Sequence, residues 1–101
     1  MDIQKQFEKM NRNYMDDIRY KGFTYHTIYS DDTCIDDGLP FSYAYRRNDD
    51  SIYKVYFKPI DGWRNMNDAS DWVNDWENDI HHIDRVTSNV SDSLDLLQQL
   101  N

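Results

Sequence analysis

The N-terminal part of the chain alternates apolar and polar positions with a helical period. Its large apolar side chains lie three or four residues apart, so a helix would place them on one face, with charged and amide residues on the other. This pattern predicts an amphipathic helix over residues 3–20. The apolar positions are Ile3, Phe7, Met10, Tyr14 and Ile18.

Three later segments alternate with a period of two and are rich in aromatic and β-branched residues. They predict strands over residues 23–29, 41–47 and 52–58. Residues 48–51 are short and polar, which favours a hairpin turn between the last two strands. Strands separated by such short connections pair antiparallel.

A helical period returns at residue 67. Apolar residues at spacings of three and four predict a helix over residues 68–86, and the same stripe continues in a short helix over 90–100. Poor helix formers at 87–89 separate the two, although one bent helix is the alternative. We therefore expect a single α+β domain, ordered α-β-β-β-α-α, with a three-stranded antiparallel sheet and helices on one face.

Length and composition limit which class of protein this chain can belong to. With 101 residues, of which 15 % are aromatic, the chain is long enough for one small ordered domain. No apolar run is long enough to span a bilayer, and the N-terminus lacks the apolar core of a secretory signal. Cys34 is the single cysteine, which excludes an internal disulfide and fits a reducing compartment. We expect the cytoplasm of a bacterial host cell.

Charge is the most informative property of the sequence. The net charge of −8 argues against direct binding to nucleic acid or to anionic membranes. Residues 1–60 are nearly neutral, with nine basic and ten acidic residues, whereas residues 61–101 hold two basic and nine acidic ones. The negative field therefore belongs mainly to the C-terminal part of the chain.

The sequence lacks the motifs that indicate catalysis or metal binding. There is no glycine-rich phosphate loop and no nucleophile elbow. The acidic loop 31–38 does not follow the ligand order of an EF-hand. His81 and His82 are adjacent, so on the predicted helix they point apart and cannot easily share a metal. We expect no enzymatic activity, no cofactor and no metal site.

A row of carboxylates is the one feature of the sequence that points to a specific function. On the predicted helix 68–86, four aspartates spaced three, four and four residues apart share one flank, beside Trp72. Like charges at this spacing destabilise a helix by roughly 0.2–0.5 kcal/mol a pair, and no lysine relieves them. A solvated helix face is the alternative explanation. The row comprises Asp68, Asp71, Asp75 and Asp79.

Three segments resemble type II-A anti-CRISPR proteins, the small acidic phage-borne inhibitors of type II CRISPR effector nucleases. Residues 46–50 resemble the acidic hairpin turn of these inhibitors, and Gly62-Trp63 resembles the entry to their second helix. Residues 72–76 resemble an aromatic-x-Asn-Asp segment within that helix. The resemblance covers roughly residues 40–80 and implies a compact α-β-β-β-α-α protein that mimics DNA.

The resemblance also implies a site. The acidic turn and helix of the family face the pocket with which the nuclease reads its protospacer-adjacent motif, where arginines bind guanine. Carboxylates in the place of phosphates would satisfy those cations. The positions that match the family are Asn48, Asp49, Asp50, Asp68, Asp71 and Asp75. Trp72 and Asp79 complete the expected partner-binding surface.

A second class of function would also depend on acidic groups that bind a basic partner. An immunity or antitoxin-type protein, or another phage inhibitor, would also present acidic groups to a basic nuclease or DNA-handling enzyme. The expected partner in either case is a basic nucleic-acid-binding protein, and a CRISPR nuclease is the first candidate. The oligomeric state and the target stay open at this point.

Overall fold

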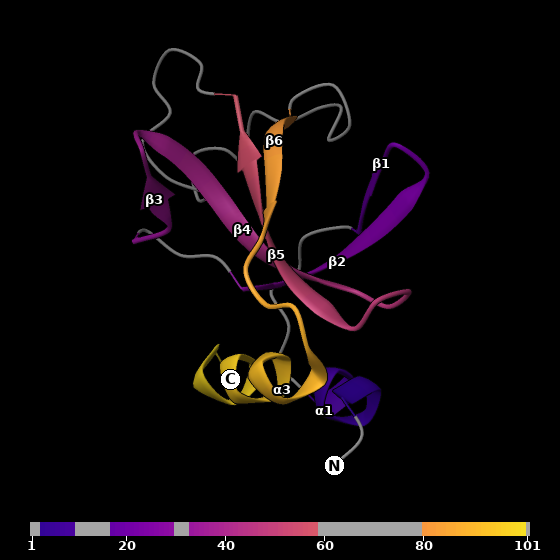
Figure 1. Ribbon diagram of the computed structural model, residues 1–101. Helices are drawn as coiled ribbons and strands as arrows, with labels where there is room; N and C mark the ends of the chain where they lie inside the picture. Colours follow the sequence, from indigo (N-terminus) through magenta and orange to yellow (C-terminus); the bar gives the residue numbers. More distant parts are fainter. Residues whose placement is uncertain (1–2, 10–16, 30–32, 59–79, 101) are drawn as a thin grey trace.

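A computed structural model describes residues 3–9, 17–29, 33–58 and 80–100. Over these residues the chain forms a curled antiparallel sheet, and two helices lie side by side at one end of it (Figure 1). The helices are α1 (Ile3–Lys9) and α3 (Val90–Leu100). The strands are β1 (Ile18–Tyr20), β2 (Phe23–Tyr29), β3 (Ile35–Asp36), β4 (Leu39–Arg46), β5 (Ser51–Phe57) and β6 (Ile80–Arg85).

The sheet follows the chain from one edge to the other, in the order β1-β2-β4-β5-β6. Every pairing is antiparallel. The long strand β4 pairs with β3 through its first two residues and with β2 through residues 43–45. The short strand β3 therefore extends the sheet on the same side of β4 as β2.

Both faces of the sheet carry a core. Because successive side chains point to opposite faces, the neighbours Ala44 and Tyr45 enter different clusters. One cluster holds Ile18, Tyr25, Ala44, Tyr53, Val55, Phe57 and Ile80. The opposite face packs against α1 and α3 through Ile3, Phe7, Ile28, Tyr45, Ile52 and Leu97. Farther along that face lie Cys34, Phe41 and Tyr56.

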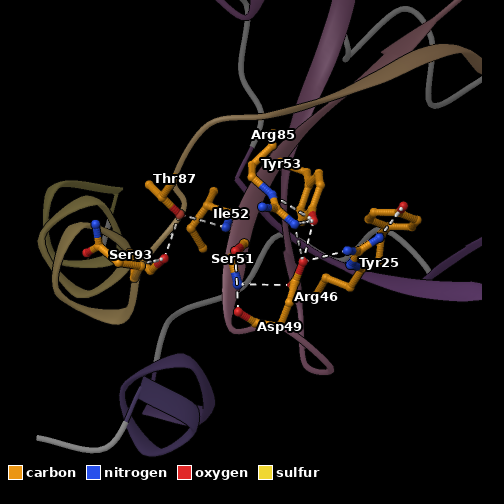
Figure 2. Close-up of polar contacts among 10 residues, drawn as sticks. Tyr25, Arg46, Asp49, Ser51, Ile52, Tyr53, Arg85, Thr87 and Ser93 are labelled. Carbon is orange, nitrogen blue, oxygen red and sulfur yellow. Dashed lines mark hydrogen bonds and ion pairs between the residues drawn. The ribbon is translucent and has the colours of Figure 1, made fainter.

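Helix α3 is joined to the sheet through the buried Thr87. The backbone N–H of Ile52 donates to Thr87 Oγ1 at 2.9 Å, and the N–H groups of Val86 and Thr87 donate to the Ile52 carbonyl (Figure 2). Thr87 Oγ1 also lies 2.5 Å from Ser93 Oγ on α3. At the start of the helix, Asn89 Oδ1 accepts from the backbone N–H of Asp92, so Asn89 acts as the N-cap.

The predicted three-stranded sheet with three helices is wrong, although the broad α+β class holds. The first discrepancy lies in the predicted helix 3–20, whose described start is helical but whose last residues, Ile18–Tyr20, form β1. Lys21 and Gly22 have positive φ angles of 52° and 85°. They make a two-residue turn that returns the chain directly into β2, so Gly22 closes a hairpin and does not end a helix.

The second discrepancy is the end of the predicted helix 68–86, where residues 80–85 form β6. The register between β5 and β6 shifts, with Val55 opposite Ile83, Tyr56 opposite His82, and Phe57 opposite Ile80. His81 is the additional residue of this bulge. It places Ile80 and Ile83, three residues apart, against the same core cluster, which reproduces the spacing of a helix.

Other predicted elements are confirmed close to their expected bounds. The strand expected over 23–29 is β2, those expected over 41–47 and 52–58 are β4 and β5, and the helix over 90–100 is α3. The part of the predicted helix that covers residues 68–79 lies outside the described residues. Within the described ranges, no helix is long and apolar enough to cross a membrane.

The Thr87 contact predicts the effect of two substitutions on stability. Thr87→Val removes the oxygen that accepts from the buried Ile52 N–H, so we expect the free energy of unfolding in urea to fall by about 1–3 kcal/mol. Thr87→Ser keeps that oxygen and is expected to lose less. Equal stability of the valine variant and the parent protein would contradict this role for the hydroxyl.

Candidate functional site

The turn between β4 and β5 contains the described part of the predicted site. Residues 47–50 connect the last cross-strand pair, Arg46 and Ser51. Asp50 has a positive φ of 53°, a conformation that Asp tolerates better than most residues. Asp49 Oδ1 accepts from the backbone N–H of Ser51 at 3.3 Å, which holds the turn from within.

The Asp49 carboxylate is the centre of a polar cluster. Its Oδ2 accepts from Arg46 Nη2 at 2.5 Å, from Tyr53 OH at 2.5 Å and from Arg85 Nη2 at 2.8 Å (Figure 2). Arg85 also donates to the hydroxyl of Tyr53. We call Arg46, Asp49, Tyr53 and Arg85 the Asp49 cluster. It joins the turn to β4, β5 and β6.

Aromatic rings pack around the guanidinium group of Arg46. Its guanidinium carbon lies 4.3 Å from the ring centroid of Phe23 and 4.5 Å from that of Tyr53, and Nη1 donates to Tyr25 OH at 3.2 Å. The buried Nε has no hydrogen-bond partner. Burial alone would lower the pKa of Arg46, but the hydrogen bonds to Asp49 and Tyr25 raise it, so the cation is permanent.

The cluster also fixes the charge of its carboxylate. Burial alone would raise the pKa of Asp49, but the hydrogen bonds from Arg46 and Tyr53 hold it below the ordinary value of 3.8. Burial and the Asp49 carboxylate together raise the pKa of Tyr53. At neutral pH the cluster therefore contains two cations, one anion and a neutral phenol.

The structure gives the predicted turn residues three different environments. Asp49 is engaged by the cluster, with its side chain only 22 % exposed. The Asp50 carboxylate accepts a hydrogen bond from the hydroxyl of Tyr45. Asn48 is exposed. Of the remaining predicted positions, none is placed, because Asp68, Asp71, Trp72, Asp75 and Asp79 lie outside the described residues.

Sequence reasoning missed the partners of Asp49. Tyr53 and Arg46 were visible near the turn, but Arg85 is 36 residues from Asp49 and was assigned to a helix. Only the pairing of β5 with β6, which sets Tyr53 opposite Arg85, brings this cation to the turn. No local pattern in the sequence encodes that pairing.

Acidic groups of the described C-terminal part stay at the surface. Asp84, Asp92 and Asp95 are exposed. The side chain of Asp84 is 62 % exposed and lies 3.3 Å from His82 Nε2. Lys54 is its cross-strand neighbour but points its ammonium toward Asp36, at 3.5 Å. Among the described residues, no lysine or arginine forms an ion pair with these three aspartates.

Metal-ligating side chains do not gather in the part of the chain that the structure describes. No group of three or more His, Cys, Asp or Glu residues there is arranged to hold a metal ion. His81 and His82 lie on β6, where their Nδ1 atoms approach to 2.7 Å, and the ring of His82 stacks on Tyr56.

The Asp49 cluster predicts a pH-dependent loss of stability. At pH 7, Asp49→Asn removes the charge that binds both arginines, and we expect the free energy of unfolding to fall by about 1.5–3 kcal/mol. A lowered pKa in the folded state means that this contribution is complete above pH 3.8 and is lost as the pH falls through the folded-state pKa. Urea unfolding at pH 7 and at pH 2.5 should therefore show the variant and the parent converging in acid.

The matched control is Asp50→Asn, the same change one residue later. Asparagine keeps an oxygen that can accept from Tyr45, and no described cation pairs with Asp50, so a smaller loss is expected. If Asp49→Asn were no more destabilising than Asp50→Asn at pH 7, the cluster would not be the main support of the hairpin.

Comparison with known proteins gives no assignment. No protein family model, no curated protein and no solved structure shows a significant match to this chain. Function must therefore be argued from the charge distribution and the geometry above, and the resemblance to type II-A anti-CRISPR proteins stays a prediction from sequence.

Proposed function

We propose that this protein is an acidic inhibitor that binds the basic surface of a nucleic-acid-binding enzyme in the place of DNA. The first target to test is a type II CRISPR effector nuclease, because residues 46–50, 62–63 and 72–76 resemble inhibitors of that class. The protein itself acts by binding and carries out no reaction in this proposal.

The observation that supports the proposal is an unbalanced negative charge in the C-terminal part of the chain. Residues 61–101 contain nine acidic and two basic residues. One of those two, Arg85, is committed to Asp49 from the preceding hairpin. Lys54 is likewise committed to Asp36. Arg85 and Lys54 therefore pair with other carboxylates and not with the described C-terminal acids. Cations of a partner protein could pair with these acids instead.

A basic DNA-binding groove would supply such cations. Lysine and arginine side chains that hold a phosphate backbone bind carboxylates with the same hydrogen-bond geometry. Complementary charge accelerates association and makes it sensitive to salt. An acidic protein of this size therefore competes with DNA without any contact to a base.

The Asp49 cluster changes the role of the hairpin within this proposal. Asp49 already has two arginine partners, so exchanging them for cations of the target would cost the folded protein its own ion pairs. We assign Asp49 to support of the hairpin and expect the contact surface to come from Asp68, Asp71, Trp72, Asp75 and Asp79. An immunity-type protein against a toxic nuclease would use the same surface.

Charge reversal tests the proposal directly. We expect Asp71→Lys combined with Asp75→Lys to weaken inhibition of DNA cleavage by a purified, guide-loaded type II-A nuclease by at least 100-fold. The parent protein should inhibit less at 0.5 M salt than at 0.1 M salt, because screening weakens the attraction. Binding to the nuclease with and without a motif-containing DNA duplex would show whether the two compete.

The control is Asp84→Lys combined with Asp95→Lys, which changes the net charge by the same amount at exposed positions of β6 and α3. This variant should retain most of its inhibition. If both variants lost the same amount of inhibition, the effect would depend on net charge alone and not on the positions of Asp71 and Asp75. No inhibition by the parent protein would exclude this nuclease and favour an immunity-type target.

A further inference from the structure

A hollow lined by charged, polar and apolar residues lies beside the Asp49 cluster and plays no part in the proposed inhibition. It has a volume of about 610 Å³ and opens between the β1–β2 hairpin and the β4–β5 turn. This volume is in the range of small-molecule sites. Six of its lining residues carry the argument below: Asp17, Arg19, Thr24, His26, Arg47 and Asn48.

The strand register places one arginine beside a threonine. Arg19 of β1 is directly opposite Thr24 of β2, and residues that pair across strands share a face of the sheet. Arg47 is the first residue after β4, and it lines the same hollow. Arg19, Thr24 and Arg47 therefore all border the hollow.

Both arginines are available to a ligand. Arg19 and Arg47 are exposed, and neither forms an ion pair with a described carboxylate. The guanidinium carbon of Arg47 lies 5.8 Å from the ring centroid of Phe7, and Arg47 also lines the hollow. Arg46, the neighbour of Arg47, differs because its guanidinium is bound to Asp49 on the opposite face of the sheet.

The carboxylate that lines the hollow already has a partner. Asp17 Oδ2 lies 2.9 Å from His26 Nδ1, and the ring of His26 packs against Phe7 at a centroid distance of 5.5 Å. The side chain of His26 is only 15 % exposed. Besides this pair, the hollow is lined by side chains that can donate hydrogen bonds, those of Arg19, Thr24, Arg47 and Asn48.

We propose that this hollow binds the phosphate group of a small phosphate monoester. Arg19 and Thr24 come from the β1–β2 hairpin, Arg47 and Asn48 come from the β4–β5 turn, and all four line the hollow. A carboxylate has two oxygens on one edge, which a single arginine can saturate, whereas a phosphate monoester has three terminal oxygens that two arginines can share. The proposal is independent of the acidic contact surface and does not rest on inhibition of a nuclease.

Titration of the full-length protein with adenosine monophosphate tests this site, with NMR amide shifts and calorimetry as readouts. We expect binding that shifts the signals of Arg19, Thr24 and Arg47. Arg19→Gln and Arg47→Gln should each weaken binding at least tenfold. Lys5→Gln, an equal charge change at an exposed position of α1, should leave it unchanged. Both arginines are exposed, so the variants are expected to fold, which circular dichroism would check.

Three further ligands identify what is bound. Inorganic phosphate binding that depends on both arginines supports the site and assigns it to free as well as esterified phosphate. Adenosine binding as strongly as adenosine monophosphate would overturn the proposal, because the phosphate would then contribute nothing. Succinate binding as strongly, with the same dependence on Arg19 and Arg47, would overturn the choice of phosphate over carboxylate. Failure of adenosine monophosphate and inorganic phosphate to bind at millimolar concentration would also overturn it.

Discussion

The Asp49 carboxylate is the interaction on which the hairpin end of the sheet depends. It binds donors from three successive strands: Arg46 at the end of β4, Tyr53 in β5 and Arg85 at the end of β6. Phe23 and Tyr25 of β2 then pack on Arg46. One ionised group thus connects four strands at the end of the sheet that carries the β4–β5 turn.

This cluster explains how a small polar chain maintains a two-sided sheet. A sheet with a core on each face needs apolar material on both, yet only 39 % of this chain is apolar even with tyrosine counted. Tyrosines contribute to these cores because each buries a large ring while its hydroxyl reaches a carboxylate: Tyr45 donates to Asp50, Tyr53 to Asp49 and Tyr56 to Asp36. These three aspartates therefore stabilise the hydrophobic clusters by satisfying the polar ends of their rings.

The strands could be predicted where apolar and polar residues alternate along the sequence, even in β2, whose register with β4 shifts between Thr27 and Tyr29. β2, β4 and β5 alternate visibly, and α3 has both a capping residue and an apolar stripe. β6 could not be recognised, because the bulge at His81 gives Ile80 and Ile83 a helical spacing. The β1–β2 hairpin depends on a positive φ at Lys21, which a lysine does not signal.

The partners of the acidic turn could not be predicted for a related reason. An acidic turn that binds a partner and one that binds its own arginines have the same composition, and only tertiary pairing distinguishes them. The sequence located Asp49 but not Arg85, and it assigned Asp17 and Arg19 to a helix, where they would not meet His26. The hollow could therefore not be predicted from a sequence pattern that indicates a helix over residues 3–20.

The two consecutive arginines at the end of β4, Arg46 and Arg47, have different surroundings. Arg46 points to the face of the Asp49 cluster, as its contacts with Phe23 and Tyr53 show, whereas Arg47 lies near Phe7 on the face covered by α1. The first arginine neutralises an acid of its own chain, whereas the second forms no ion pair with a described carboxylate and lines the hollow.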